Sequence, residues 1–472
     1  MPHPAVTLEN MNRHVRKAEY AVRGRLAIRA EELRKDLRSG NANLPFSEII
    51  NANIGNPQAM DQQPITFFRQ VLALVQYPDL LDSEYADAIF PADARERAKI
   101  LLNEIGSVGA YSQSQGVELI RKSVADFISR RDGFPADYND IYLASGASSA
   151  VANLLRTICD GPDTAVMIPV PQYPLYSATL TIENATAVPY YLEDSTENMA
   201  EVIRKTVNSG LTLRAVVVIN PCNPTGTCLK RQEIQEVITL AAENSLMIIA
   251  DEVYQTNIYD GEFFSFKRIL RELQRDFPGR YNIELASLHS TSKGMVGECG
   301  QRGGYLELVG FDSAVRDQFY KLVSISLCPV VTGQVLTELM VNPPKEGDES
   351  YALYKKEYDY IYQSLKERAY ALFEAFKTME GVTCEEPNGA MYLFPRITLP
   401  TKAIQEAQHH NLSPDEYYCI QLLEETGVCV VPGTGFGQKD GTYHFRTTFL
   451  APGHDYVHRM VDFHKQFLDK FR

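Results

Sequence analysis

The sequence of 472 residues contains no tryptophan, so a flat ligand that stacks on this protein must use tyrosine, phenylalanine or histidine. No apolar run approaches the roughly 20 residues that a membrane-spanning helix needs, and the N-terminal segment has no apolar signal core. The eight cysteines are scattered without a C-x-x-C pair, which in a long chain indicates reduced thiols rather than disulfides or a zinc site. We therefore expect no membrane partner and no metal.

Positive charge is also in short supply, because 46 basic residues face 60 acidic residues and the net charge is −14. An acidic chain argues against nucleic acid or an anionic membrane as the main partner. We expect a cytoplasmic protein, with the mitochondrial matrix as the alternative because the first residues include several arginines. The interspersed glutamates and the absence of serine before Ser39 argue against a transit peptide.

The length exceeds what a single hydrophobic core of ~250–300 residues accommodates, so more than one domain is expected. We predict that residues 1–75 form an N-terminal arm and the first part of a small domain, that residues 76–342 form a large ligand-binding domain, and that residues 343–472 complete the small domain. The last boundary follows Pro343–Pro344 and a polar segment, 345–350, that looks like a linker.

From about residue 116, short apolar runs alternate with helical stretches. The runs lie at 141–144, 165–170, 215–220, 246–251 and 285–289, and the helical stretches at 116–131, 147–158 and 230–245. This alternation predicts an α/β fold with a mostly parallel sheet. Polar or glycine-rich residues follow each run at once, and ligands of such sheets bind at the carboxyl ends of the strands. The five strand ends are therefore expected to form one site.

Outside this region the pattern predicts helices at 66–75, 350–378 and 414–426. Short strands are expected at 391–394, 427–431 and 442–448, with a glycine-rich loop at 432–437. Residues 12–38 are charged and helix-compatible, and residues 41–66 are rich in loop-forming residues.

Lys293 follows the last apolar run in the motif Ser290-Thr-Ser292-Lys293. A deprotonated lysine is nucleophilic and can form an imine with an aldehyde cofactor, and neighbouring cations lower its pKa. The two serines can bind a phosphate group, and Arg302 can pair with it. Taken alone, the motif favours a solvated loop lysine, and only the motifs that accompany it favour the imine-forming role.

Asp251 and Tyr254 follow another run, and Asn223 lies in the turn motif N-P-C-N-P-T-G. A buried aspartate at a strand end is costly unless a cation pairs with it. A protonated pyridine nitrogen is such a cation, and the pairing strengthens a pyridine cofactor as an electron sink. Tyr254 and the amide of Asn223 can bind the ring oxygen of the same cofactor. The alternatives are a capping aspartate and a simple tight turn.

Three further segments carry candidate ligand contacts. The small residues around Ala147 and Ser148 lie between a strand and a helix, where backbone N–H groups can bind an anion, or merely cap the helix. Tyr173 lies between prolines and can stack on a flat ring or pack in the core. Arg446 lies on a late strand and can clamp a carboxylate with two hydrogen bonds, or form a salt bridge.

Together and in this order, these segments resemble the class I (fold type I) pyridoxal-phosphate-dependent aminotransferases. The order is Y-x-x-x-x-G, S-G-A-S, P-Q-Y-P-x-Y, N-P-x-N-P-T-G, D-E-V-Y, S-x-S-K, R-G-G and a C-terminal arginine. The resemblance covers nearly the whole chain. Segments such as GAYSQSQGVELIR (109–121) and HSTSKGMVGECGQRGGY (289–305) are similar to eukaryotic members that use alanine.

The resemblance implies a seven-stranded, mostly parallel sheet between helices, a smaller α+β domain, and pyridoxal 5′-phosphate as the cofactor. The implied cofactor-binding residues are Tyr111, Ala147, Ser148, Tyr173, Asn223, Asp251, Tyr254, Ser290, Ser292, Lys293 and Arg302. Lys293 is the implied catalytic residue, and Gly55 and Arg446 would bind the substrate carboxylate. Tyr111 would reach the site of the partner subunit in a homodimer, and the peptide bonds before Pro171 and Pro224 would be cis.

One departure from the family pattern concerns the phosphate-binding arginine, which in many members lies eight residues after the lysine. Gln301 occupies that position here and Arg302 follows it, so the glycine-rich stretch must absorb one residue.

The implied reaction is ping-pong transfer of an amino group from L-alanine to 2-oxoglutarate, giving pyruvate and L-glutamate. Alternatives within the fold are an aminotransferase for aromatic or branched-chain amino acids or for glyoxylate, and a lyase. A regulatory protein with an aminotransferase-like domain is a further alternative, but no helix-turn-helix pattern precedes the site-forming region.

Overall fold

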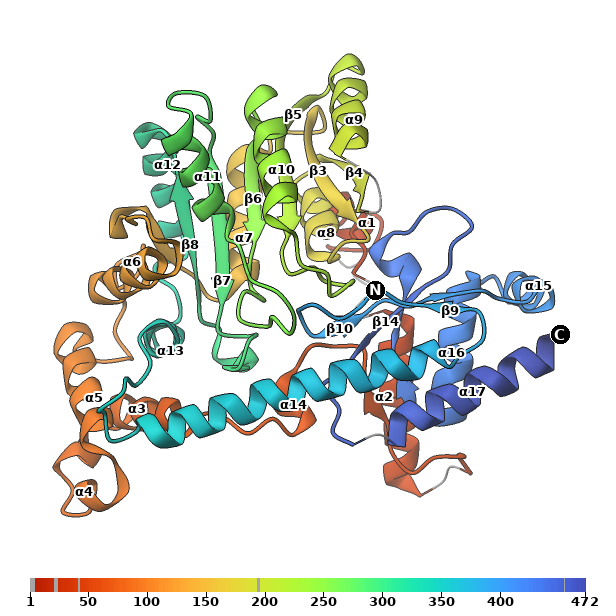
Figure 1. The fold of residues 1–472 in the computed structure, drawn as a ribbon, viewed down its shortest axis with the longest axis horizontal. Helices are drawn as coiled ribbons and strands as arrows, with labels where there is room; N and C mark the ends of the chain where they lie inside the picture. The colour runs from red at the N-terminus through yellow and green to blue at the C-terminus, as the bar shows by residue number, and fades with distance from the viewer. Residues whose placement is uncertain (1–4, 21–23, 41–42, 193–195, 454) are drawn as a thin grey trace.

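The computed structural model describes residues 5–20, 24–40, 43–192, 196–453 and 455–472. Parts of the predicted N-terminal arm, at 1–4, 21–23 and 41–42, lie outside the described residues. Helices cover both faces of a central sheet, and the long helix α14 (Tyr351–Lys377) runs beneath the sheet toward the C-terminal elements (Figure 1).

The central sheet has seven strands in the order β2-β8-β7-β6-β5-β3-β4. They are β2 (Ile141–Leu143), β3 (Thr164–Val170), β4 (Thr186–Tyr191), β5 (Thr212–Ile219), β6 (Met247–Asp251), β7 (Leu285–Ser290) and β8 (Gly304–Val309). Strand β8 is antiparallel to both of its neighbours, and the other pairs are parallel. The predicted α/β class and the five predicted strands are confirmed.

The apolar runs of the sequence did not predict strands β4 and β8, for two different physical reasons. Strand β4 lies at the edge of the sheet, where only part of its surface is buried. Strand β8 carries the fully buried Glu307, whose carboxylate pairs with Lys267, so a charge interrupts the apolar run.

Side chains of alternate residues on the strands enter two different cores. Val216 and Val218 of β5 pack in a cluster with α10 (Arg231–Glu243) and α11 (Phe266–Asp276). Ala215 and Val217 of the same strand enter a second cluster with α7 (Ala147–Ile158), α8 (Leu175–Ile182) and α12 (Ser313–Ser324). Burial on both faces explains the continuous apolar runs. Helices α6 (Glu118–Asp132), α9 (Thr196–Asn208) and α13 (Val331–Val341) also contact strands of the sheet.

The C-terminal elements build three small sheets, one of which includes the N-terminal strand β1 (Ile50–Asn51). Strand β1 pairs in parallel with β12 (Val428–Cys429), and β10 (Tyr392–Leu393), β14 (Phe445–Thr448) and β13 (Val431–Pro432) form an antiparallel sheet. The third sheet pairs β9 (Val382–Thr383) with β11 (Arg396–Ile397). The helices around them are α2 (Arg25–Ser39), α15 (Thr401–His409), α16 (Pro414–Thr426) and α17 (Asp455–Phe471). The domain boundaries stay a prediction.

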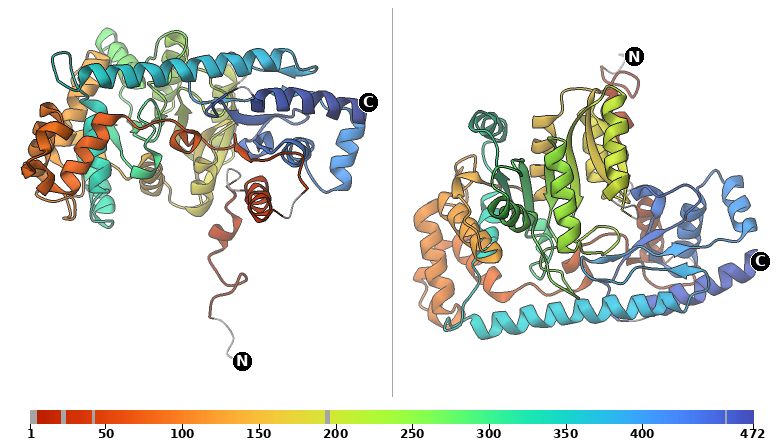
Figure 2. Two further views of the ribbon diagram at one scale, coloured as in Figure 1. Left: turned by 90° about the horizontal axis from the view of Figure 1, so that it is seen from below. Right: turned by 45° about the horizontal axis from the view of Figure 1, so that its top comes forward.

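The remaining helices precede the sheet in the chain. Helix α1 (Arg13–Lys17) lies against α8 (Figure 1), and the described residues that precede it extend away from the body of the molecule (Figure 2, left). Helices α3 (Thr66–Gln76), α4 (Ala86–Ile89) and α5 (Ala92–Ile105) follow. Both predicted cis bonds, before Pro171 and Pro224, are present, and the bond before Pro221 is also cis. Among the described residues, no helix is long and apolar enough to cross a membrane.

Candidate active site

A cavity of about 510 Å³ lies where the strand ends of the central sheet face the C-terminal elements. Of the thirteen predicted site residues, all but Tyr111 line it: Gly55, Ala147, Ser148, Tyr173, Asn223, Asp251, Tyr254, Ser290, Ser292, Lys293, Arg302 and Arg446. Tyr111 lies outside the cavity and is 77% exposed.

The topology of the sheet explains why these residues meet. Asp251 ends β6, Asn223 follows the end of β5, and Lys293 follows the end of β7. Because β8 runs antiparallel to them, its start, and Arg302 just before it, lies at the same edge. Gly55 and Arg446 come from the N-terminal segment and from β14.

Lys293 lies at the centre of the cavity wall. Its Nζ donates a hydrogen bond of 2.7 Å to the carbonyl oxygen of Gly55 and lies 5.9 Å from the ring centroid of Tyr254. Gly294 turns the chain directly after the lysine with a φ of +65°, and its N–H donates to Oδ1 of Asn257 at 2.9 Å. A side chain at position 294 would strain this left-handed turn, so the glycine helps to aim the lysine into the cavity.

Asp251 is a buried carboxylate that the protein satisfies only in part. Its Oδ2 accepts a hydrogen bond of 2.9 Å from the hydroxyl of Tyr176, whereas its Oδ1 is buried without a partner among the described residues. Burial raises the pKa of Asp251 to about 6, although the bond from Tyr176 acts in the opposite direction. An unpaired buried carboxylate oxygen costs free energy, so the site suits a ligand that brings a donor or a positive charge to it.

A second group of contacts forms an anion site at the start of α7. Arg302 donates through Nη2 to the carbonyl of Ser145 and the hydroxyl of Ser148, both at 3.2 Å. A Cβ on Gly146 would stand 2.2 Å from the same Nη2, so the absent side chain makes room for the guanidinium. The hydroxyl of Ser290 lies nearby, donating to the carbonyl of Gly303 at 3.2 Å. A cation, a helix N-terminus and hydroxyl groups together suit a phosphate group.

The residue that displaces Arg302 from the family spacing is accommodated locally. Residues Cys299–Gln301 form a short 3-10 turn, and Arg302 itself adopts a left-handed conformation with a φ of +57°. This turn returns the arginine to the edge of the sheet, where its Nη1 donates to the carbonyl of Cys299 at 3.0 Å.

Arg446, which also lines the cavity, is buried to 1% exposure. Its Nη1 donates to Oδ1 of Asn223 at 3.0 Å, its Nη2 donates to the carbonyl of Asn53, and its Nε has no partner among the described residues. The rings of Tyr392 and Phe436 lie 4.3 and 4.6 Å from the guanidinium carbon. Because the oxygen of Asn223 is occupied by Arg446, its NH₂ group is the part left to donate to a ligand.

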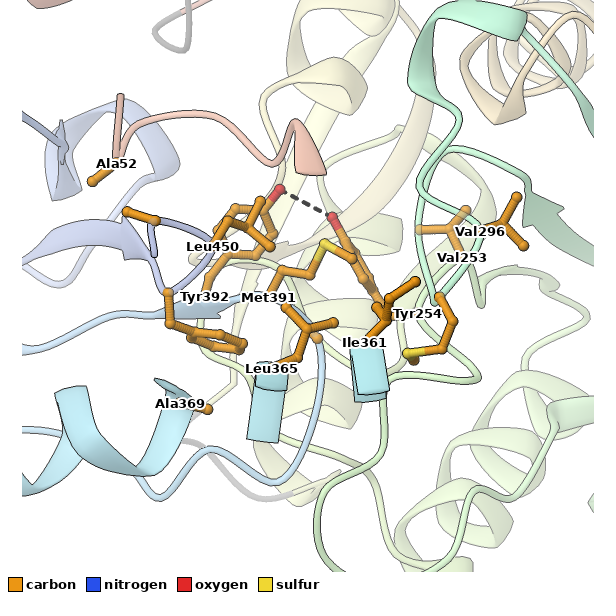
Figure 3. Packing of buried hydrophobic residues seen from close by; sticks show 14 of the residues in the cluster. Ala52, Val253, Tyr254, Val296, Ile361, Leu365, Ala369, Met391, Tyr392 and Leu450 are labelled. Atoms are coloured by element: carbon orange, nitrogen blue, oxygen red, sulfur yellow. Dashed lines mark hydrogen bonds between the residues drawn. The ribbon is translucent and has the colours of Figure 1, made fainter. Parts of the chain in front are cut away.

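Sequence reasoning missed three tyrosines of the site. The ring of Tyr392 contacts the guanidinium of Arg446. Its hydroxyl accepts a hydrogen bond of 3.2 Å from the Tyr254 hydroxyl (Figure 3). Tyr20 lines the cavity, and its hydroxyl is 2.7 Å from that of Tyr173. Tyr176 ends the motif P-Q-Y-P-L-Y, so its signal was visible, whereas no motif marks Tyr20 or Tyr392.

The charges of the cavity favour an anionic ligand, because Lys293, Arg302 and Arg446 face a single carboxylate, Asp251. Burial raises the pKa of the Tyr392 phenol, but the Lys293 ammonium, the Arg446 guanidinium and the bond from Tyr254 outweigh burial and lower the pKa below its ordinary value. Burial also raises the pKa of Tyr254 well above its ordinary value.

Comparison with known proteins agrees with this arrangement. The family model of the class I and II aminotransferases matches residues 78–460. The mitochondrial alanine aminotransferase of Saccharomyces cerevisiae is 53% identical over 485 aligned residues, covering 100% of this chain and 82% of its own length. A second S. cerevisiae protein, named an inactive alanine aminotransferase, is 50% identical and covers 100% and 96%. The solved structure of an alanine aminotransferase from Pyrococcus furiosus has the same fold, with a TM-score of 0.74 at 23% identity, covering 97% and 100%.

Proposed function

Because the chain belongs to the class I and II aminotransferase family, we propose that it transfers the amino group of L-alanine to 2-oxoglutarate, giving pyruvate and L-glutamate. A relative at 50% identity is named inactive, so overall identity does not by itself establish activity. The observation that carries the proposal is the cavity in which Lys293, Asp251 and Arg446 come together with an anion site.

The residues of the cavity fit pyridoxal 5′-phosphate. The unpartnered Oδ1 of Asp251 would accept from the protonated ring nitrogen, and the Tyr254 hydroxyl and Asn223 amide would donate to the ring oxygen. Tyr173 would stack on the ring, and Lys293 would form an imine with the aldehyde. The phosphate would be bound by Ala147, Ser148, Ser290, Ser292 and Arg302. When bound, the cofactor supplies an electron sink for the negative charge left on the substrate Cα.

The protein's own residues orient the substrate and move its proton. Arg446 binds the substrate carboxylate through its guanidinium, beside the backbone of Gly55. The free amine of Lys293 is the base that removes the Cα proton, and it would deliver this proton to the carbon of the bound cofactor that carried the aldehyde. Asp251 keeps the bound ring protonated. Burial of these groups excludes water, which strengthens each electrostatic contact.

We also propose a homodimer in which Tyr111 binds the phosphate in the partner subunit's site. Tyr111 is exposed, and so are the large apolar side chains of Ile325 and Leu327. The Ser114 hydroxyl donates to the carbonyl of Leu327 at 2.6 Å, which joins the two segments on one surface. Exposed apolar patches of this kind mark interfaces between proteins.

For the compartment, our proposal is the cytoplasm, with the mitochondrial matrix as the alternative. All eight cysteines are free, which suits either reducing compartment. The S. cerevisiae relative is named mitochondrial, so localisation of a C-terminally tagged chain decides between the two.

The decisive experiment is a panel of amino-acid half-reactions on the purified protein, following formation of pyridoxamine phosphate. Alanine and glutamate are expected to react fastest, and a preference for tyrosine, a branched-chain amino acid or glycine would overturn the proposed substrate.

Lys293→Ala should abolish turnover and the imine absorbance band, whereas Lys345→Ala, at an exposed lysine, should leave both unchanged. Retention of both by Lys293→Ala would refute the assignment of the catalytic lysine.

A further inference from the structure

A second cavity, of about 370 Å³, lies against the segment that carries Lys293. Its wall includes residues of α3, α6, α13 and the start of α14, which lie together at the left of Figure 1. Lys293 lines both this second cavity and the active-site cavity, whereas Asp251 and Arg446 line only the active-site cavity. A space of this volume is within the range of sites for small organic ligands.

Most of the wall of the second cavity is apolar. The ring centroids of Phe68 and Tyr354 lie 6.1 Å apart, and those of Tyr354 and Tyr358 lie 5.9 Å apart, so α3 and α14 together present three aromatic rings. Other apolar residues of the wall are Ile65, Phe127, Met295, Val296, Met340 and Val341. Water finds few hydrogen-bond partners on such a wall, so the cavity favours a ligand with a flat apolar body.

His289 is a polar group in the buried part of the wall. It is 2% exposed, its ring lies nearly parallel to that of Phe127 with the centroids 6.4 Å apart, and its Nδ1 has no hydrogen-bond partner among the described residues. Burial lowers the pKa of His289 to about 3, so the imidazole is neutral. A neutral imidazole offers one donor and one acceptor. A hydroxyl group, which can donate or accept, is therefore a better partner for it than a charged group.

The exposed part of the wall carries positive charge. Arg130 and Lys345 are both exposed, and no acidic residue is among the described residues that line the second cavity. Nη2 of Arg130 donates to the carbonyl of Val341 at 3.3 Å, which holds the guanidinium beside α13. Two cations next to an apolar cavity favour a ligand that carries one carboxylate.

We propose that the second cavity binds a small aromatic monocarboxylate with a hydroxyl group at the end opposite the carboxylate. The ring packs against the aromatic wall, the carboxylate pairs with Arg130 and Lys345, and the hydroxyl bonds to His289. Because Met295 and Val296 follow Lys293 closely in the chain, the ligand contacts the segment that carries the lysine. It does so without entering the active-site cavity, so the ligand and an amino acid bind at the same time.

Calorimetric titration of the holoenzyme with para-hydroxyphenylpropionate tests the proposal, because this molecule carries both end groups. Its dissociation constant should lie below about 1 mM, as expected for about twelve non-hydrogen atoms. The titration is repeated with aminooxyacetate, which reacts with the cofactor aldehyde and occupies the active-site cavity. The dissociation constant should then change by less than about twofold, because the two sites are separate. Loss of binding in the presence of aminooxyacetate, or no binding at about 5 mM ligand, would overturn the proposal.

Substitutions in the exposed part of the wall test the carboxylate contact. Arg130→Gln combined with Lys345→Gln should weaken binding of para-hydroxyphenylpropionate about three- to tenfold, because two exposed charge pairs are lost. Lys356→Gln is the matched control, since this exposed lysine of α14 does not line the second cavity, and it should leave binding unchanged. Equal effects of the control and of the double variant would contradict the assigned site.

His289→Phe tests the hydroxyl contact, because it keeps an aromatic ring in the buried wall and removes both ring nitrogens. Binding of para-hydroxyphenylpropionate should weaken about two- to tenfold, as for the loss of one hydrogen bond. Binding of phenylpropionate, which lacks the hydroxyl, should not weaken. The KM for alanine should stay the same in all of these variants, since none of the altered residues lines the active-site cavity. An equal loss for both ligands would refute the contact with His289.

Discussion

The hydroxyl of Tyr176 donates a hydrogen bond of 2.9 Å to Oδ2 of Asp251, at the base of the cavity. Tyr176 is fully buried and comes from α8, whereas Asp251 ends β6. The bond occupies one carboxylate oxygen and leaves the other free for a ligand. Tyr176 thus both orients Asp251 and helps to keep it ionised.

Tyr176→Phe should move the acidic limb of the alanine half-reaction to higher pH. The pKa of Asp251 is about 6, and the bond from Tyr176 lowers it, so loss of that bond raises the pKa further. Since the carboxylate form exists above this pKa and is lost as the pH falls through it, the rate at pH 7 should drop about two- to tenfold. The measurement is the pH dependence of kcat/KM. Tyr190→Phe is the control, because its buried hydroxyl donates to the carbonyl of Val217; a limb displaced equally in both variants would contradict the prediction.

Gly55→Ala should impair both folding stability and activity. Its Cβ would stand 2.1 Å from the Tyr392 hydroxyl oxygen, so overpacking should lower the free energy of unfolding by about 1–3 kcal/mol. Adding Tyr392→Phe removes the clashing oxygen and should recover part of this loss, which urea denaturation of both single variants and the double variant would measure. At Gly109, where an added Cβ meets only Ser107 Oγ at 3.6 Å, the same substitution should cost little. The prediction would be contradicted if the changes in the free energy of unfolding caused by Gly55→Ala and Tyr392→Phe simply added in the double variant.

Mixing two inactive variants tests the proposed role of Tyr111. Lys293→Ala lacks its own lysine, and Tyr111→Ala lacks the residue proposed for the partner subunit's site. A mixed dimer contains one site with both residues intact, so unfolding and refolding an equimolar mixture should restore roughly a quarter of the wild-type activity. Activity no higher than the mean of the two separate variants would show that Tyr111 acts within its own subunit, or not at all.

Lys267→Met should destabilise the protein strongly, because Lys267 and Glu307 form a buried ion pair at 1% and 2% side-chain exposure. The substitution leaves an unpaired buried carboxylate, which costs about 3–5 kcal/mol, whereas Lys267→Met with Glu307→Leu should recover most of the loss. Thermal and urea unfolding would provide the values. The exposed pair of Lys355 and Asp359 supplies the control, since Lys355→Met should change stability by less than about 1 kcal/mol. Equal effects at both lysines would contradict the role of burial.

The sequence predicted the parts of the fold in which one local signal dominates. Strands β3, β5, β6 and β7 are buried on both faces and appear as continuous apolar runs. Strand β8 was missed because the buried Glu307 depends on a cation from another element, and β4 because it lies at an edge. The same distinction separates Lys293, which a motif marks, from Tyr20, whose contact with Tyr173 joins positions 153 residues apart.

The sequence by itself determined which chemical groups meet at the edge of the sheet, because Asp251 ends a strand and Asn223 and Lys293 each follow one, and the alternation of strands and helices sets the direction of these strands. Only the tertiary structure decided how these groups share protons. The pKa of Tyr392 depends on its burial and on its distances to Lys293 and Arg446. These three residues come from separate parts of the chain. Electrostatic interactions follow distance in space and local solvation, and neither quantity is encoded in the spacing of residues along the chain.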